Sequence, residues 1–244
     1  MVGHNSHENI SRVQEGGSSL LLFGTLIGQY NFEYSRKDDT GLGRWVSMVL
    51  QGQNDIVTRI VCAYNPYHNN KKGSRTMYQQ HCCYFITKEK GRTCPRKRFR
   101  QDLEKKLTTW RENGKRLIVC MDANKNIYTK SIGRMLTDRE GWEMKEVVGD
   151  FTGKNAGAIF FRVTTPIESV WSTPDVEVTG ACVMPCGYGV GDHRLFVVDF
   201  WTTSLLGDTP PRVIRASARK LNNKIPRVAE RYTKRLEKTY SSIA

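Results

Sequence analysis

Short apolar runs, separated by polar turns, dominate the first part of the chain. Three of them are 18–24 (SSLLLFG), 44–50 (RWVSMVL) and 57–64 (VTRIVCAY). Runs of this length, rich in β-branched and long apolar residues, are typical of buried strands. The segment 35–43 (SRKDDTGLG) is expected to be a polar loop. The turn QGQND at 51–55 favours an antiparallel hairpin between the second and third strands.

A different period begins after the polar loop 65–75. Apolar residues recur every three or four positions, with charges opposite, which predicts an amphipathic helix that packs by one stripe. The stripe consists of Phe99, Leu103, Leu107 and Trp110. The helix should end at the ENGK turn, 112–115. The wholly apolar run 116–121 (RLIVCM) then reads as a strand buried on both faces.

The second half of the chain is also rich in strand-like pieces. They follow a short helix expected around 131–136 and a glycine-rich loop at 153–158. The predicted strands are 158–162 (AIFFR), 167–172 (IESVWS), 181–185 (ACVMP) and 195–201 (LFVVDFW). Several strands at short spacing, together with the helices, predict an α/β fold with mainly antiparallel sheets.

With 244 residues, 39% of them hydrophobic, the chain can bury one sizeable core. We expect a polar segment at 1–17, one domain at 18–206 and a basic tail at 207–244. Residues 210–244 contribute ten Lys or Arg and two Glu. Pro226 is expected to start an amphipathic helix in this tail, whose apolar face would be Val228, Tyr232, Leu236, Tyr240 and Ile243.

The net charge of +14 favours a polyanionic partner. Nucleic acid, with DNA preferred, is the partner that we expect, although charge alone would also suit an anionic membrane. The tract 88–100 (KEKGRTCPRKRFR) carries seven basic residues and one acid, so it is predicted to contact the nucleic-acid backbone, with a solvated helix start as the alternative. The expected contact residues are Arg96, Lys97, Arg98 and Arg100.

The seven cysteines are an odd number and several lie within apolar runs, which indicates a reducing compartment. Cys182 and Cys186 are four apart without a matching second pair, so no zinc site is expected. The apolar run 19–28 is too short and too broken by glycine to span a bilayer. We therefore expect an intracellular protein, nuclear or cytoplasmic, without signal peptide or membrane anchor.

Polar side chains of catalytic type lie at the ends of several predicted strands. Tyr64, Asp122 with Asn124, and Asp192 with His193 occupy three such ends, and Glu168 lies at a strand start. Each position also has a structural explanation when taken alone. Asp192 and His193 suit a turn, Asp122 and Asn124 an Asx turn, Tyr64 a core or rim aromatic and Glu168 a solvated charge. In a sandwich of two sheets, however, strand ends gather at one edge, so these residues can line a single cleft.

Such a cleft would suit metal-assisted phosphodiester hydrolysis. Asp122 and Asp192 can hold a hard cation, Mg²⁺ or Mn²⁺, through oxygen ligands. Asp122 can also orient or deprotonate the attacking water, and Asn124 can donate hydrogen bonds to phosphoryl oxygens. His193, oriented by Glu168, can act as base or phosphate ligand, and Tyr64 can supply a hydroxyl to the same phosphate.

Four motifs carry a resemblance to a known superfamily. They are YNP at 64–66, MDAN at 121–124, IESVW at 167–171 and GDHR at 191–194. In order and spacing the chain resembles, over residues 16–201, the endonuclease/exonuclease/phosphatase (DNase-I-like) superfamily, and within it the endonuclease domains attached to retrotransposon reverse transcriptases. The resemblance implies a four-layered α/β sandwich of two packed, mainly antiparallel sheets flanked by helices. It also implies a divalent cation, phosphodiester cleavage and an ancestral link to a reverse transcriptase.

The chain departs from the family pattern at several points. Met121 replaces a glycine, Glu168 an aspartate and Gly191 a serine. The family's first two strands, which carry an asparagine and a metal-binding glutamate, precede the run at 18–24, so we expect an N-terminally incomplete domain. Three functions stay open: an active endonuclease, a non-catalytic nucleic-acid-binding remnant, and a lipid or inositol phosphatase of the same superfamily.

Overall fold

The computed structural model describes residues 2–4, 17–69, 76–129, 131–137, 143–155, 157–158, 160, 164–188 and 192–208, and four isolated positions beyond these. Contacts divide the chain into Met1–Arg212 and Val213–Ala244. In the second unit the described residues, Arg227, Glu230, Thr233 and Lys234, are helical, and Lys234 pairs with Glu230 at 3.0 Å. The expected apolar face of that tail helix lies outside the described residues.

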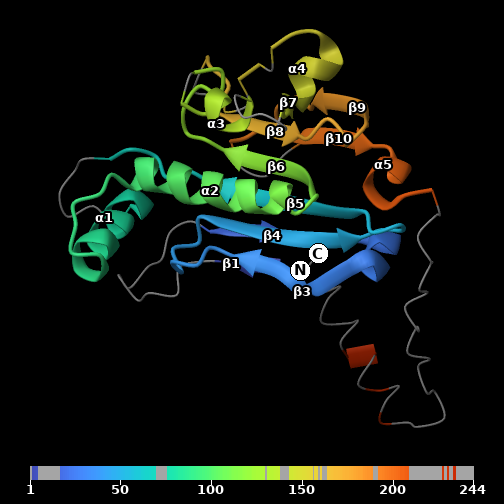
Figure 1. Ribbon diagram of the computed structural model, residues 1–244, viewed down its shortest axis with the longest axis horizontal. Helices are drawn as coiled ribbons and strands as arrows, with labels where there is room; N and C mark the ends of the chain where they lie inside the picture. Colours follow the sequence, from blue (N-terminus) through green and yellow to red (C-terminus); the bar gives the residue numbers. More distant parts are fainter. Residues whose placement is uncertain are drawn as a thin grey trace. The chain divides into compact units, whose positions relative to one another are not determined.

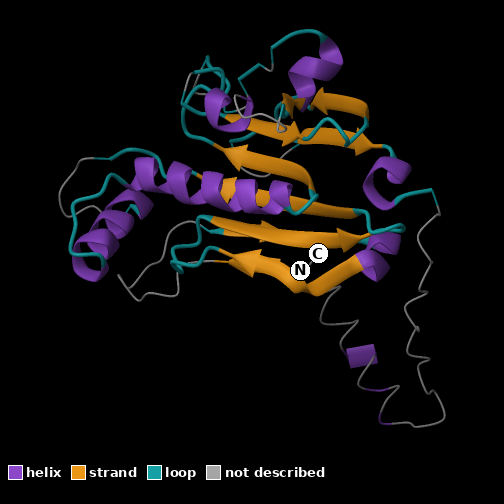
Figure 2. Ribbon diagram, viewed as in Figure 1, coloured by secondary structure: helices purple, strands orange, loops and turns teal. Residues whose placement is uncertain are grey.

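A six-stranded sheet forms the centre of the first unit (Figures 1 and 2). Its order is β3 (Tyr30–Lys37), β4 (Trp45–Gln51), β5 (Val57–Tyr64), β6 (Arg116–Asp122), β8 (Glu168–Ser172) and β7 (Lys145–Glu146). Only β5 and β6 pair in parallel. The predicted hairpin between β4 and β5 is confirmed. Its turn places Asn54 and Asp55 at positive φ, which these two residue types tolerate well.

The predicted amphipathic helix is α2 (Pro95–Glu112), and it covers one face of this sheet. Its stripe is confirmed, because Phe99, Leu103 and Leu107 are fully buried in a cluster with Leu117 and other odd-numbered residues of β6. Ile118 of β6 is buried in a second cluster on the opposite face. Burial of β6 on both faces is therefore also confirmed.

Strands β9 (Val178–Val183) and β10 (Phe196–Phe200) form a separate antiparallel pair. Their apolar side chains join the cluster on the sheet face opposite α2. Helices α4 (Val147–Thr152) and α5 (Thr202–Leu206) contribute to the same cluster through Val147 and Leu206. The protein thus has the predicted mixed α/β fold, with helices and two packed sheets. A further short pair joins β1 (Val2–His4) to β2 (Ser18–Leu20).

Two predictions near the start of the domain are wrong. The run 18–24 is a strand only as far as Leu20, and Gly24, at φ +66°, opens a 3₁₀ helix, η1 (Gly24–Gln29). The expected loop 35–43 overlaps the end of β3. This strand lies at the edge of the sheet and is largely exposed, so its composition is polar and hides its extended conformation.

Three α-helices were not predicted, α1 (Met77–Lys88), α4 and α5. Helix α1 buries Gln80 and His81 beside Phe85, so its buried face has no clean apolar period. The short helix expected around 131–136 is α3 (Gly133–Thr137). Of the predicted strand 158–162, Phe160 forms an isolated bridge with His193, while 159 and 161–162 lie outside the described residues. None of the described helices has the length and apolar character needed to cross a bilayer.

Candidate active site

Three predicted site residues form a row across neighbouring strands. Tyr64 is the last residue of β5, Asp122 the last of β6 and Glu168 the first of β8. The pairing register places Asp122 opposite Tyr64 on one side and opposite Glu168 on the other. Parallel β5 and β6 end at one edge, and antiparallel β8 begins there. We call Tyr64, Asp122 and Glu168 the strand-end row.

Asn124 holds the Asp122 carboxylate in place. Its backbone N–H donates to Asp122 Oδ1 at 2.9 Å, which closes an Asx turn. Its side-chain Nδ2 donates to Asp122 Oδ2 at 3.3 Å and to the Asn65 carbonyl at 2.9 Å. Asn124 adopts φ +45°, in the left-handed region where asparagine is enriched. The Asx turn predicted for Asp122 and Asn124 and the predicted site role of these residues are thus compatible. In this structure Asn124 is a positioning residue for Asp122.

Two further residues brace this turn. Asn65 is fully buried, and its side chain donates to the Ala123 carbonyl at 2.8 Å. Arg96, one of the expected nucleic-acid contacts, is half-buried and donates to the carbonyls of Ala123 and Asn124 at 3.1 and 3.0 Å. Asn65 was not predicted as a site residue. Its signal in the sequence is its place directly after the strand that ends at Tyr64.

His193 is held from three directions. Its Nδ1 is hydrogen-bonded to Glu168 Oε1, the contact that the sequence predicts. The Phe160 ring stacks on the imidazole at 4.9 Å between centroids. Asp192 Oδ1 lies 3.7 Å from Nε2, and both Asp192 and His193 are exposed. The imidazole therefore stands at the surface, orientated by a more buried carboxylate. Gly191 of the same motif lies outside the described residues.

The acids of the strand-end row titrate above their usual range. Burial raises the pKa of Asp122 to about 6, and repulsion from Glu168 adds to this, while hydrogen bonding from Asn124 and the positive charges of His193 and Arg96 oppose it. Burial also raises the pKa of Glu168, against attraction to His193. Burial and the charge of Asp122 raise the pKa of Tyr64. A carboxylate with a raised pKa is a stronger base than a solvated one.

The donor set fits a hydrated divalent cation. Glu168 Oε2 is buried without a hydrogen-bond partner, next to the half-buried Asp122. Two adjacent carboxylates with raised pKa values are what a cation would stabilise, and Mg²⁺ commonly binds through one or two carboxylates plus water. No group of three or more His, Cys, Asp or Glu gathers as a ligand set among the described residues. Asp192, predicted as a second ligand, contacts His193.

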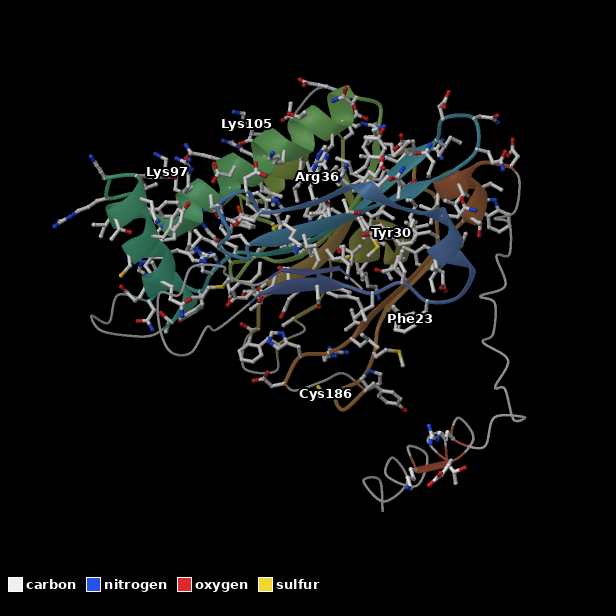
Figure 3. All side chains as sticks on the ribbon, turned by 90° about the horizontal axis from the view of Figure 1, so that it is seen from below. Phe23, Tyr30, Arg36, Lys97, Lys105 and Cys186 are labelled. Atoms are coloured by element: carbon white, nitrogen blue, oxygen red, sulfur yellow. The ribbon has the colours of Figure 1, made fainter. Side chains whose placement is uncertain are left out.

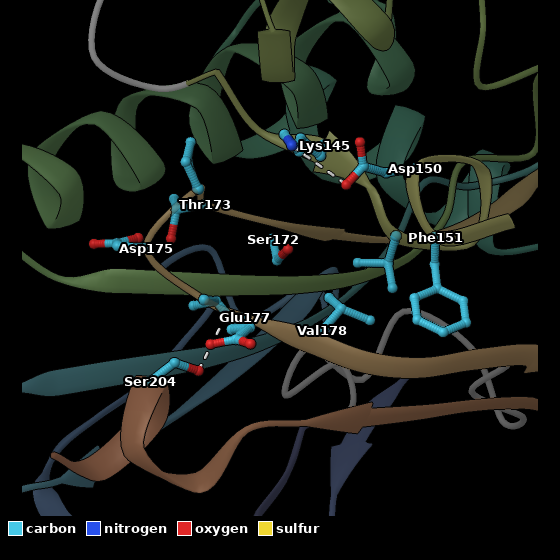
Figure 4. A pocket seen from close by; sticks show the side chains of 12 residues that line it. Lys145, Asp150, Phe151, Ser172, Thr173, Asp175, Glu177, Val178 and Ser204 are labelled. Atoms are coloured by element: carbon cyan, nitrogen blue, oxygen red, sulfur yellow. Dashed lines mark hydrogen bonds and ion pairs between the residues drawn. The ribbon is translucent and has the colours of Figure 1, made fainter. Parts of the chain in front are cut away.

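A cavity of about 530 Å³ adjoins the strand-end row, between the central sheet and β10. All three row residues line it, together with apolar side chains such as Phe196 and Phe200. A second cavity of about 550 Å³ lies at the other end of β8 (Figure 4). Asp175 in that cavity pairs with Arg111 at 2.8 Å. The first cavity alone contains the candidate chemistry.

The predicted basic contacts differ in how far they are already paired. Arg98 forms ion pairs with Asp102 at 2.9 Å and Glu89 at 3.3 Å. Lys97 is exposed and extends away from the central sheet (Figure 3), without an ion pair to any described residue. Arg100 is half-buried and likewise has no ion pair within the described part of the chain. Lys97 and Arg100 are thus the better placed of the four for an external phosphate.

Comparison with known proteins gives similarity at the level of solved structures. The human Nocturnin catalytic domain shares 13% identity at a TM-score of 0.43, over 64% of this chain and 52% of that one. An endonuclease/exonuclease/phosphatase from Bacteroides vulgatus shares 12% identity at a TM-score of 0.41, over 64% of this chain and 54% of that one. An AP endonuclease from Archaeoglobus fulgidus shares 11% identity at a TM-score of 0.44, over 65% of each chain. The chain therefore spans between half and two thirds of these structures. No protein-family model and no curated protein matches it.

Proposed function

We propose that this protein is a divalent-metal-dependent phosphoesterase that hydrolyses phosphodiester bonds in nucleic acid, in the manner of an endonuclease. The observation that carries the proposal is the strand-end row: a buried carboxylate with a raised pKa at its centre, a tyrosine on one side and a carboxylate bonded to His193 on the other. Base, hydrogen-bond donor and imidazole are thereby brought to one sheet edge, which is what hydrolysis of a phosphodiester requires.

Asp122 is the base in this mechanism. With a pKa of about 6 it is ionised at pH 7, yet it accepts a proton from water more readily than an ordinary aspartate does. The N–H groups of Asn124 fix both carboxylate oxygens, so little reorganisation is needed when the proton moves. Cleavage should therefore increase with pH through about 6 and level off above it.

His193 and Tyr64 act on the phosphate. Since Glu168 contacts Nδ1 of His193, Nε2, which lies 3.7 Å from the exposed Asp192, is the nitrogen left to bind a phosphoryl oxygen or to transfer a proton to the leaving group. The raised pKa of Tyr64 keeps its hydroxyl protonated at neutral pH, so it can donate a hydrogen bond to the same phosphate. Glu168 is a positioning residue for the imidazole.

A bound Mg²⁺ or Mn²⁺ ion would offset negative charge on the phosphoryl oxygens and on the leaving group. Asp122 and the unpartnered Oε2 atom of Glu168 are the residues that would hold it, with Asp192 as a further oxygen ligand at the exposed end of the site. The motif resemblance further suggests a retrotransposon endonuclease ancestry, with a reverse transcriptase as the former neighbour.

Nucleic acid, with DNA first, is the substrate class that the net charge of +14 favours. Lys97→Ala should weaken DNA binding and reduce the slope of log K against log salt by about one. Arg98→Ala is the matched control, because Arg98 is already neutralised by Asp102 and Glu89, and it should leave the slope nearly unchanged. Fluorescence anisotropy over a salt series measures both slopes. Equal slopes for wild type and Lys97→Ala would refute a phosphate contact at Lys97.

Nicking of supercoiled plasmid tests the proposed function. We expect nicked circles in the presence of Mg²⁺ or Mn²⁺ and none in EDTA. Binding that persists in EDTA, with no nicking in either metal, would instead establish the non-catalytic remnant. Phosphate release from a phosphoinositide by a preparation that leaves plasmid intact would establish the lipid or inositol phosphatase.

A further inference from the structure

Arg59 is a buried cation with no ion pair among the residues that the structure describes. The residue, in β5, is only 4% exposed. Its Nη1 donates to the Ser47 hydroxyl at 2.8 Å, and its guanidinium carbon lies 4.4 Å from the centre of the Trp110 ring. Its Nε has no hydrogen-bond partner. It forms no ion pair with any carboxylate in the described part of the chain, which is unusual because burying an unpaired charge is costly.

Arg44 shows how this fold treats a buried arginine when it is structural. Arg44 is fully buried, and its guanidinium pairs with Asp38 at 2.7 Å and with Asp102 at 2.9 Å. The guanidinium of Arg59 instead contacts the Trp110 ring and the Ser47 hydroxyl, where Arg44 contacts two carboxylates. Burial and the nearby Arg36 lower the pKa of Arg59 to about 10, so the side chain is still charged at neutral pH. No described carboxylate forms an ion pair with this charge, so it is left to solvent ions or to a bound anion.

Arg59 lines a cavity of about 240 Å³. Tyr34, Gln51 and Lys115 supply further donors there, Val49 and Val57 form apolar walls, and the exposed Asp55 is the one carboxylate among the lining residues. A water molecule takes about 30 Å³ of liquid volume, so the cavity has room for a tetrahedral oxyanion with several waters. We call it the Arg59 pocket.

The Arg59 pocket is distinct from the strand-end row. Residues of β5 alternate between the two faces of the sheet. Arg59 lies on the face of Trp110 and α2, where Val61 and Ala63 are also buried. Tyr64, five residues further on, lines the cavity on the β10 side. A ligand in the Arg59 pocket therefore does not compete with a substrate at the row.

We propose that the Arg59 pocket binds a phosphate group. An arginine presents a planar fork of donors that matches two oxygens of a phosphate, and Lys115 adds a second positive charge. The lining carries two cations, Arg59 and Lys115, against one exposed carboxylate, Asp55, so a net positive charge favours an anion, and the several donors suit a tetrahedral oxyanion. The phosphate can be inorganic, or it can be the terminal phosphate of a nucleotide chain.

Thermal unfolding in phosphate and in chloride at equal ionic strength tests this inference, with inorganic phosphate as the probe. Phosphate at ten times its Kd should raise the Tm of the wild type by about 3–6 °C relative to chloride. Arg59→Met keeps the length of the side chain and should abolish the shift without lowering the Tm in chloride. Lys105→Gln, an exposed change on α2, is the control that should keep the full shift.

An equal increase of Tm in phosphate for wild type and Arg59→Met, or no increase for the wild type, would overturn the proposal. If Arg59→Met does not fold, Lys115→Ala is the second variant, and it should weaken phosphate binding severalfold. An oligonucleotide with a 5′-phosphate and the same oligonucleotide without it distinguish the sources. A larger Tm shift with the phosphorylated than with the unphosphorylated strand, and no such difference in Arg59→Met, indicates a nucleotide end. These Tm measurements do not depend on cleavage activity, so a failure of the phosphate proposal can be distinguished from a failure of the proposed function.

Discussion

Asp122→Asn is expected to lower phosphodiester cleavage by a factor of about 10²–10⁴, because it removes the base while preserving the shape of the site. In the same preparation it should raise the free energy of unfolding at pH 7. The two effects have one cause. The protein keeps a charged carboxylate in a half-buried place beside Glu168, where the charge is needed for chemistry and destabilises the fold.

The direction of the stability change follows from the pKa of Asp122 in the two states. Burial raises this pKa to about 6 in the folded protein, from 3.8 for an ordinary aspartate. Between these values the folded state binds more protons than the unfolded state, so stability falls as pH rises through the window. Above pH 6 the penalty is complete, and asparagine removes it. The gain should be about 1–3 kcal/mol at pH 7, since one pKa unit corresponds to about 1.4 kcal/mol and asparagine loses part of the hydrogen bonding.

Urea denaturation of both proteins at pH 4 and pH 7 measures this difference. The wild type should lose stability relative to Asp122→Asn between the two values. Asp150→Asn changes an exposed carboxylate that pairs with Lys145 at 3.4 Å, and as the matched control it should change neither stability nor cleavage much. An Asp122→Asn protein that is less stable at pH 7 and still cleaves would contradict this account of Asp122.

His193→Ala is expected to reduce cleavage by about 10²–10⁴-fold, and the loss should overlap with that of Glu168→Gln. Because Glu168 orients the imidazole through Oε1, the double variant at saturating Mg²⁺ should lose less than the product of the two single losses, and only the contribution of Oε2 to metal binding should add to His193→Ala. Single-turnover rates of the four proteins complete the cycle. Additive losses would show that Glu168 and His193 act independently.

A positioning role for Glu168 has a further signature in the conservative variant. Glu168→Gln removes the carboxylate that contacts Nδ1, so the imidazole should be less well oriented and the rate should fall. Glu168→Asp retains the charge and should recover part of the rate. Equally slow cleavage by both variants, each shown to be folded, would indicate that Glu168 serves only the fold.

Much of this architecture follows from local patterns. The stripe of α2, the hairpin of β4 and β5, and the two buried faces of β6 are each set by the spacing of apolar residues. The site residues could be recognised because strand ends meet at a sheet edge. The spacing of residues along the chain does not show which strand ends are neighbours. The pairing register shows this, because it places Asp122 opposite Tyr64 on one side and opposite Glu168 on the other.

The elements that escaped prediction depend on tertiary context. β3 is a polar edge strand, and α1 buries His81 and Gln80 among apolar residues, so neither shows a clear hydrophobic period. The Phe160 stack on His193 joins distant segments, and no local pattern encodes such a contact. The same holds for Arg59, whose position in an apolar strand reveals neither its burial nor its lack of an ion pair among the described residues.

The most direct test of the strand-end row as a phosphodiesterase site is plasmid nicking by wild type, Asp122→Asn and Asp150→Asn, all shown to be folded. Wild type and Asp150→Asn should nick plasmid in a metal-dependent way, and nicking should fall at least about a hundredfold in Asp122→Asn. Undiminished nicking by Asp122→Asn, or none by the folded wild type in Mg²⁺ and Mn²⁺, would contradict the assignment of the strand-end row as a phosphodiesterase site.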